Sequence, residues 1–229
     1  MKIVARIKSD FPGKFGIPRQ SGLVDEIVST IVFEEEFRVD EALRGIEEYS
    51  HLWLIWEFSE NKREKWSPTV RPPRLGGNKR VGVFATRSSF RPNSIGLSSV
   101  RLLGVEKTKD TGTVLVVSGA DLMDGTPIYD IKPYLAFTDS HPDAKSSFAG
   151  ERFSYGLSVE IPPEEKKKIP EEKLGAIIKI LENDPRPSYI DDENRGYAFE
   201  YASMHIEFKV AGNVLTVVRV EKINNFKEE

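Results

Sequence analysis

The chain has 229 residues, of which 39% are hydrophobic, and its formal net charge is −3. That length suits one large domain or two small ones, with ample apolar core. It contains no cysteine, which excludes structural disulfides, thiolate zinc sites, iron–sulfur clusters and cysteine nucleophiles.

The first part of the chain is predicted to form strands joined by a structured loop and a short helix. Alternating or β-branched apolar residues indicate strands at 2–8, 27–33 and 52–58. The third strand is apolar on both faces, so we expect it to be largely buried. Five prolines and glycines make residues 11–23 a loop. Asp40 is expected to cap a short helix whose Leu43 and Ile46 face inward.

The middle of the chain is also predicted to be β. Four strands follow in quick succession, at 81–86, 97–105, 113–118 and 128–133. Many short strands with few helices favour a closed or sandwiched β architecture over alternating βαβ units. No Gly-x-Gly-x-x-Gly motif follows a strand, which argues against a Rossmann nucleotide site. The three histidines lack the spacing of metal ligands, so we predict no metal site.

The composition becomes polar and small between residues 139 and 150, and we place a domain boundary there. The predicted domains are residues 1–145 and 150–229. In the second, residues 162–168 are predicted to be a charged linker. Residues 171–181 are predicted to be an amphipathic helix whose apolar positions are Leu174, Ile177, Ile178 and Leu181. Strands are expected at 197–201, 205–210 and 214–220, which makes this domain a small α/β unit.

A strongly basic segment lies between Asn61 and Arg91. It holds nine Lys or Arg and one acid, Glu64, so nine minus one gives a local charge of +8. Aromatic residues are interleaved with the charges, namely Trp66, Phe84 and Phe90. We interpret the segment as a surface that faces a polyanion, although charge runs are commonly no more than solvated faces.

Three islands of Gly, Pro and polar residues lie on loops between the predicted strands, at 71–78, 84–97 and 121–134. Such turns aim polar side chains at a common point, which predicts a binding site on a rigid sheet. Asp121 and Asp124 could bind ribose hydroxyls, a cation or a positively charged cofactor, or only the backbone of their own turn. Arg87 and Arg91 could hold a phosphate or carboxylate, or simply staple the loop.

At these islands the sequence resembles the TsaA/YaeB family. The resemblance is carried by Arg91-Pro-Asn-Ser-Ile-Gly-Leu-Ser98 and by Asp124-Gly-Thr-Pro-Ile-Tyr-Asp-Ile-Lys-Pro-Tyr134. It extends to the segments 18–23, 50–53, 70–78 and 184–189, and so covers nearly the whole chain. Ser94 and Ser21 depart from the family, which usually has proline at both positions.

The resemblance implies a mainly β fold with an α+β appendage: a single-sheeted TsaA-like β-barrel core plus a small C-terminal α/β domain. It implies an S-adenosylmethionine-dependent methyltransferase that is a homodimer. Its substrate would be N6 of threonylcarbamoyl-adenosine, adjacent to the tRNA anticodon on its 3′ side. A methyl transfer from sulfonium to nitrogen requires no metal and no cysteine. The alternatives are a non-catalytic cofactor- or RNA-binding module, or methyl transfer to another acceptor.

The resemblance also implies roles for individual residues. The cofactor would be bound by Ser21, Gly22, Leu23, Arg87, Leu97, Asp121, Leu122, Met123 and Asp124. The residues implied near the reacting nitrogen are Asn93, Asp130, Lys132 and Tyr134, with Asp130 or a tyrosine as a possible base. The anticodon stem-loop of the tRNA would be contacted by Lys62, Arg63, Lys65, Arg71, Arg74, Lys79 and Arg80.

No stretch of the sequence is suited to a membrane or to export. Residues 1–7 are too short and too charged for the apolar region of a signal peptide. The longest apolar run, Leu52–Trp56, is far shorter than a membrane span. We therefore expect a cytoplasmic protein with no membrane partner.

Overall fold

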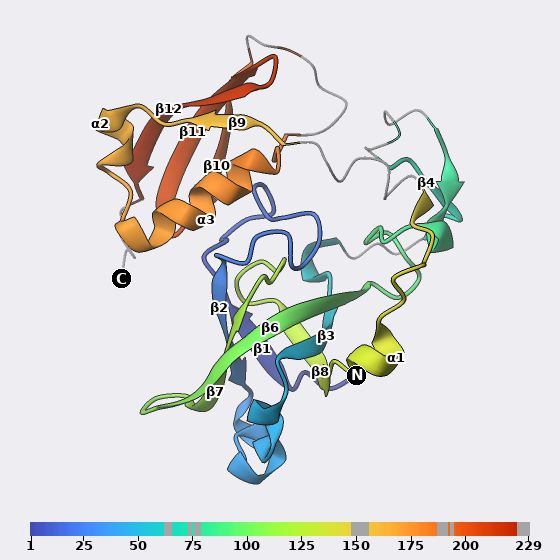
Figure 1. Cartoon of the computed structure of the whole chain (residues 1–229). Coiled ribbons are helices and arrows are strands. Elements are labelled where there is room, and N and C mark those ends of the chain that lie inside the picture. The colour runs from blue at the N-terminus through green and yellow to red at the C-terminus, as the bar shows by residue number, and fades with distance from the viewer. Residues whose placement is uncertain are drawn as a thin grey trace.

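The computed structural model describes residues 1–61, 66–72, 75, 79–147, 156–186, 192 and 195–223. Its larger part is an antiparallel sheet that closes on itself as a six-stranded barrel (Figure 1). In spatial order its strands are β1 (Ala5–Lys8), β2 (Val28–Phe33), β7 (Gly112–Ser118), β6 (Ile95–Thr108), β3 (His51–Glu57) and β8 (Pro127–Pro133). Ala5 of β1 pairs with Ile128 of β8 and closes the ring. The prediction of a mainly β chain with few helices is confirmed.

The alternation of β3 builds the interior of the closed sheet. Leu52, Leu54 and Trp56 are 0%, 0% and 6% exposed, because their side chains point inward. The residues between them, Trp53 and Ile55, are only half-buried. The expectation that both faces of this strand are buried is therefore correct for one face alone.

Two local predictions in this part of the chain are wrong, and the first is that Asp40 caps a helix. Asp40 does not cap a helix, because it lies inside the 3-10 turn Asp40–Leu43. Its carboxylate instead accepts hydrogen bonds from Lys107 Nζ at 2.7 Å and Thr113 Oγ1 at 2.6 Å, which lower the pKa of Asp40. Two more 3-10 turns flank it, Glu35–Phe37 and Ile46–Glu48. Leu43 and Ile46 pack against the core as predicted.

The strand expected at 81–86 ends early. Only β5 (Val81–Gly82) is extended, and it pairs with β4 (Thr69–Val70) as a two-stranded arm. The chain then turns into the 3-10 helix Val83–Ala85, which is held by the Thr86 hydroxyl donating to the carbonyl of Val83 at 2.8 Å. That turn buries Val83 and leaves Phe84 71% exposed. A further 3-10 turn, Ser59–Asn61, follows β3.

The C-terminal part is a four-stranded sheet covered by a helix. The sheet order is β10 (Tyr197–Tyr201), β11 (Met204–Ala211), β12 (Val214–Lys222) and β9 (Ser158–Glu160). The short β9 was not predicted from the sequence, and it pairs parallel to β12. The predicted amphipathic helix is α3 (Glu171–Glu182), but it buries Ile180 where we expected Ile178. The short α1 (Ala136–Asp139) precedes the predicted polar boundary.

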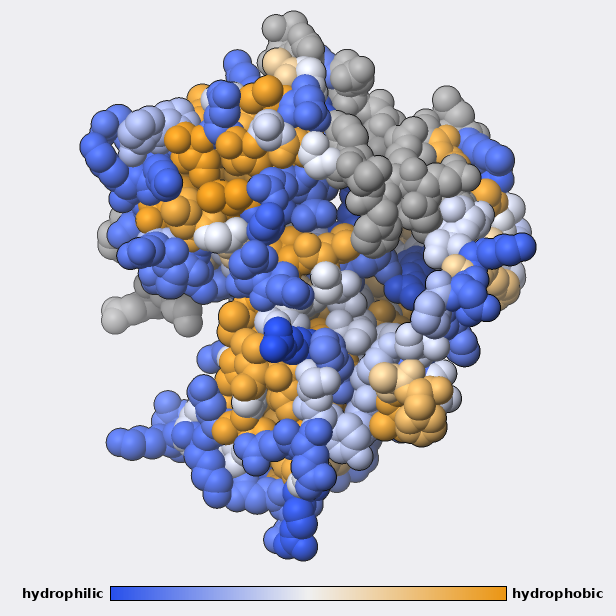
Figure 2. Space-filling model, in the orientation of Figure 1, coloured by the Kyte–Doolittle hydropathy of each residue, from blue (hydrophilic) through white to orange (hydrophobic). Residues whose placement is uncertain are grey.

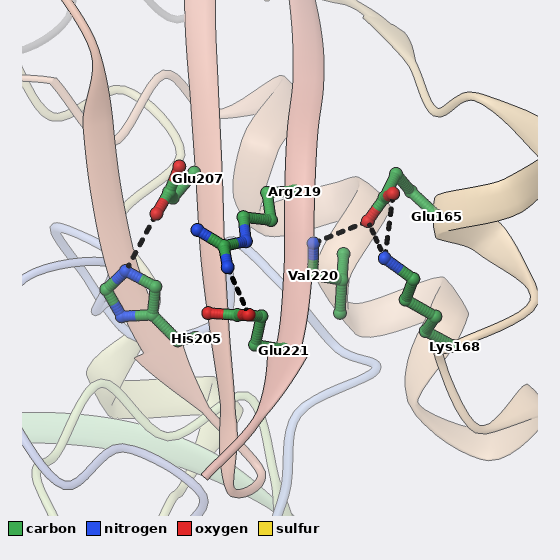
Figure 3. Close-up of polar contacts among 7 residues, drawn as sticks. All are labelled: Glu165, Lys168, His205, Glu207, Arg219, Val220 and Glu221. Atoms are coloured by element: carbon green, nitrogen blue, oxygen red, sulfur yellow. Dashed lines mark hydrogen bonds and ion pairs between the residues drawn. The ribbon is translucent and has the colours of Figure 1, made fainter.

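The predicted charged linker at 162–168 is instead a docked helix, α2 (Pro163–Lys166). Figure 3 shows Glu165 accepting hydrogen bonds from Lys168 and from the backbone of β12, where the Val220 N–H donates at 2.6 Å. The pairing of β9 with β12 ends at Thr216, so β9 offers no backbone acceptor to β12 beyond that residue. The carboxylate of Glu165 provides the acceptor for the Val220 N–H instead. Both hydrogen bonds lower the pKa of Glu165, and the one from Lys168 has the larger effect. On the same sheet the figure shows Arg219 paired with Glu221.

The loop between β1 and β2 joins the two sheets. Its apolar residues Phe11, Val24 and Ile27 are buried in the same cluster as the C-terminal sheet and α3. The Phe11 and Tyr201 rings lie 4.9 Å apart, and Asp10 accepts a charged hydrogen bond from Lys173 of α3 at 2.5 Å. Figure 1 shows this loop, in blue, beneath the C-terminal sheet. The loop therefore contributes side chains to the hydrophobic core of the C-terminal part and is more than a surface connection.

Replacing Gly16 by alanine is expected to weaken this joint. Gly16 has φ +94°, and an added Cβ would lie 2.5 Å from the ring of Phe199, a buried residue of β10. We expect the free energy of unfolding to fall by about 2 kcal/mol in urea denaturation, from overpacking and backbone strain together. Gly13→Ala is the control, because its Cβ would have no neighbour within 4 Å. Equal stability of the two variants would contradict the assignment.

Candidate functional site

A cavity of about 490 Å³ opens at one end of the closed sheet. Its walls are residues of four segments: the loop 14–20, the end of β3 with residues 58–60, the Thr86–Arg91 loop with the start of β6, and the turn 121–126. Of the predicted cofactor residues, Arg87, Leu97, Asp121 and Met123 line it. Two of the three predicted islands, 84–97 and 121–134, thus share one cavity, whereas no described residue of the island at 71–78 is among its lining residues.

Asp121 is a half-buried acid in the lining of this cavity. The Ser98 hydroxyl donates to its Oδ1 at 2.5 Å, and the Trp56 indole N–H donates to the same hydroxyl at 2.9 Å. Ser98 is completely buried. Burial raises the pKa of Asp121, and the hydrogen bond from Ser98 opposes that shift, as does the charge of Arg87. The carboxylate is therefore held in one orientation in a poorly solvated place.

Three arginines also line the cavity, namely Arg19, Arg87 and Arg91. Arg91 donates to the carbonyl of Thr86 at 2.6 Å, and Arg87 donates to the side chain of Gln20 at 2.5 Å. Arg19 donates to the carbonyls of Asp184 and Arg186 at 3.2 and 2.9 Å. The Asp184 to Arg186 segment of the C-terminal part therefore helps to orient a cavity residue.

The other predicted cofactor residues surround the cavity without lining it. The Ser21 hydroxyl accepts the N–H of Ser99 at 3.1 Å, the Gly22 N–H donates to Gly119 at 2.8 Å, and Leu23 packs on the C-terminal core. Leu122 is buried in the closed sheet. Asp124 is exposed, and its carboxylate accepts the N–H of Ser9 at 3.0 Å. In this structure these residues hold the turns from which the lining residues extend.

The residues expected near the reacting nitrogen lie elsewhere. Asp130 and Lys132 form an ion pair of 2.8 Å on β8, where they pair with Ile55 and Trp53. The ring of Tyr134 lies 5.4 Å from that of Trp53. Side chains opposite Trp53 and Ile55 point out of the closed sheet, so these three residues share its outer face. Asn93 is exposed in the turn before β6, and it is not among the lining residues.

Sequence reasoning missed three lining residues at the end of β3, namely Trp56, Glu57 and Phe58. The rings of Trp56 and Phe58 lie 4.3 Å apart. Nearby, burial and the hydrogen bond with Glu57 raise the pKa of Tyr129 to about 12, so this phenol stays protonated at neutral pH. The signal was present, because an acid at the end of an otherwise buried apolar strand has no packing role.

The donor set of the cavity fits S-adenosylmethionine, the cofactor that the resemblance implies. The volume lies in the usual range for small-molecule sites. Asp121 and Glu57 suit the positive amino and sulfonium groups or the ribose hydroxyls, while Arg87 suits the carboxylate. Trp56 and Phe58 offer aromatic surface for an adenine ring. Among the described residues, no group of three His, Asp or Glu is arranged to hold a metal ion.

Two models of domains from a class of tRNA-modifying proteins match this chain, one over the closed sheet with its cavity and one over the C-terminal part. The model of the tRNA-methyltransferase O N-terminal domain matches residues 6–140, and that of the TrmO C-terminal domain matches residues 155–223. The chain belongs to the TrmO family.

Relatives and solved structures agree with this assignment. The tRNA (adenine(37)-N6)-methyltransferase of Escherichia coli strain K12 is 40% identical over an alignment of 224 residues that covers 94% of each chain. A Pseudomonas aeruginosa protein, provisionally named an S-adenosylmethionine-dependent methyltransferase, is 40% identical over 81% of each chain. A crystal structure of TrmO from Pseudomonas aeruginosa matches with a TM-score of 0.79 at 31% identity, covering 97% of both chains.

Proposed function

We propose that this chain is an S-adenosylmethionine-dependent methyltransferase acting on N6 of the adenosine next to the tRNA anticodon, on its 3′ side. The acceptor is the N6 nitrogen of threonylcarbamoyl-adenosine. The observation that carries the proposal is the cavity with its half-buried, oriented Asp121, in a chain of the TrmO family. The proposed domains are residues 1–145, with the closed sheet as the family's cofactor-binding barrel, and residues 150–229.

The bound cofactor supplies a methyl group on a positively charged sulfur. Asp121 and Glu57 place negative charge in the cavity, which favours a cation there. Arg87 and Arg91 provide forked donors for a carboxylate. Ser21, Gly22, Leu23, Leu122 and Asp124 support the turns that carry the lining residues. The transfer breaks the sulfur–methyl bond, forms the N6–methyl bond and releases S-adenosylhomocysteine, and the proton of N6 leaves to water or to a base such as Asp130. Holding the two substrates in line lowers the barrier greatly.

The outer face of β8 is the proposed place of the acceptor-side residues Asp130, Lys132 and Tyr134, and Asn93 lies in the turn before β6. They do not line the cavity of their own chain, so we propose a homodimer in which they approach the cavity of the partner. Exposed leucines on β6, Leu97 and Leu103, are 51% and 50% exposed and suit such a contact. Dimers of identical chains are the commonest oligomers.

The proposed tRNA contacts lie on the basic segment and the C-terminal part. Arg71, Lys79 and Arg80 are exposed beside the two-stranded arm, where they can reach phosphates of an anticodon stem-loop. The other four predicted contacts, Lys62, Arg63, Lys65 and Arg74, lie outside the described residues. No helix in the described part of the chain has the length and apolar character to cross a membrane. Because the proposed substrate is a tRNA, we propose that the protein acts in the cytoplasm.

The test is incubation with S-adenosylmethionine and a tRNA that carries threonylcarbamoyl-adenosine but lacks its N6 methyl. We expect mass spectrometry of the nucleosides to show the gain of one methyl on that nucleoside. Cofactor binding without any methyl gain would favour the alternative, a non-catalytic cofactor- and RNA-binding module. Methyl gain on a different RNA or on a small molecule would keep the chemistry and overturn the acceptor.

A further inference from the structure

Two large aromatic side chains are exposed together beside the cavity. Phe84 and Trp66 are 71% and 53% exposed, and their ring centroids lie 6.2 Å apart with 34° between the planes. The guanidinium of Arg91 lies over the Phe84 ring, 5.7 Å from its centroid. The three side chains form a cluster that we call the aromatic platform.

The platform is held in place by its own loop. Val83 is buried under it and fixes the 3-10 helix from which Phe84 projects. Arg91 donates to the carbonyls of Thr86 and Val83, at 2.6 and 3.4 Å, so the orientation of its guanidinium is constrained. Arg91 also lines the cavity. The platform is therefore continuous with the proposed cofactor site.

The surroundings of the platform are basic. Arg80 is exposed and donates to the Thr69 hydroxyl of β4 at 3.0 Å, which fixes it on the two-stranded arm next to the platform. Arg71 and Lys79 are exposed and flank the same end of that arm, beyond the pair of Val70 and Val81. Figure 2 shows hydrophilic and apolar surface intermixed over the region of β4. Exposed aromatic rings among cations suit a flat, apolar group attached to phosphates, and a nucleobase of RNA has that chemistry.

We propose that Trp66, Phe84 and Arg91 form a stacking surface for an unpaired base of the RNA, next to the adenosine that is methylated. The inference rests on the proposed function, because it assumes an RNA substrate at this cavity. Stacking there would hold the anticodon loop open beside the cofactor site. An aromatic face stacks on any base, so the platform contributes to affinity and positioning and does not read the sequence.

The test uses an anticodon stem-loop RNA with 2-aminopurine beside the target adenosine. We expect Phe84→Ala and Trp66→Ala each to weaken binding by about tenfold, since stacking is worth about 1–3 kcal/mol per base. Wild-type protein should quench 2-aminopurine fluorescence and Phe84→Ala should not. Phe84→Trp should retain both properties, whereas Phe84→Leu should lose them. Tyr49→Ala, at an exposed aromatic beside the Ile46–Glu48 turn, is the control.

Several outcomes would overturn the platform while methylation by the wild type stands. One is unchanged affinity and quenching in both alanine variants. Another is full binding by Phe84→Leu, which would indicate apolar contact without stacking. A third is a loss of the dimer in Phe84→Ala, measured by light scattering, which would make the platform a contact between two copies. Failure of wild-type protein to methylate tRNA would count against the proposed function itself, whatever the variants do.

Discussion

Asp121→Asn is expected to lose cofactor affinity and to gain stability at neutral pH. The carboxylate is half-buried in the cavity, and its charge is the feature that a cationic ligand would recognise. A charged hydrogen bond is worth about 1.5–3 kcal/mol, so affinity for S-adenosylmethionine should fall roughly 10- to 100-fold in calorimetry. Asparagine keeps an oxygen that can accept from Ser98, so the fold should survive.

The gain in stability has a predicted pH dependence. Burial raises the pKa of Asp121 above its ordinary 3.8, so the folded chain holds this proton more tightly than the unfolded chain. The free energy of unfolding should therefore fall as the pH rises from 3.8 through the raised pKa. In Asp121→Asn the free energy of unfolding should not fall in this way. The variant should therefore be more stable than the wild type at neutral pH, and this difference should shrink in acid.

Denaturant titrations from acidic to neutral pH, together with calorimetry, measure both effects. Asp110→Asn is the matched control, because this aspartate is exposed in the turn after β6. It should change neither cofactor affinity nor the pH profile. If Asp121→Asn bound S-adenosylmethionine as tightly as the wild type, the carboxylate would not be a cofactor ligand. If its pH profile matched that of the wild type, the desolvation argument would be wrong.

Gly96→Ala is expected to damage both the fold and the site. Gly96 pairs directly with Trp56 across β6 and β3, and an added Cβ would lie 2.2 Å from the indole. Trp56 is 6% exposed, so the ring has little space in which to move. Overpacking of this kind costs about 3 kcal/mol, which urea denaturation would measure. Displacing the indole should also break its hydrogen bond to Ser98 and so release Asp121.

The loss of catalysis should exceed what instability explains. Misplacing a site residue by about 1 Å costs on the order of 100-fold, so we expect such a fall in tRNA methylation under conditions where Gly96→Ala stays folded. Gly104→Ala is the control on the same strand, since its Cβ would have no neighbour within 4 Å. Gly96→Ala with Trp56→Phe should recover stability but not activity, because phenylalanine cannot donate to Ser98. Full activity in Gly96→Ala would contradict this role of Trp56.

Much of the fold could be predicted from the sequence because it rests on local patterns. The alternation from Leu52 to Phe58 and the apolar spacing of α3 are set by the geometry of strand and helix. The predictions for Asp40 and for the stretch that begins at Val83 were wrong for a common reason. Their conformation depends on partners distant in sequence, Lys107 and Thr113 for Asp40, and on the burial of Val83.

The candidate site was predictable in composition but not in arrangement. Turn chemistry identified Arg87 and Asp121, and the family resemblance added Leu97; all three line one cavity. The resemblance also placed Asp130 and Lys132 near the reacting nitrogen, although the pleat of β8 turns both side chains to the outer face. Trp56 resembled a core residue, and nothing in its neighbours indicated a bond to Ser98.

By itself the sequence determined the mainly β class, the strands of the closed sheet and the polar islands, because strand periodicity and turn residues act over a few positions. Only the tertiary structure decided which islands meet, which way each strand residue faces, and that the loop from Asp10 to Ile27 joins the two sheets. Those features depend on the register of strands far apart in the chain. A shift of one residue in that register reverses every side chain, and no local pattern specifies it.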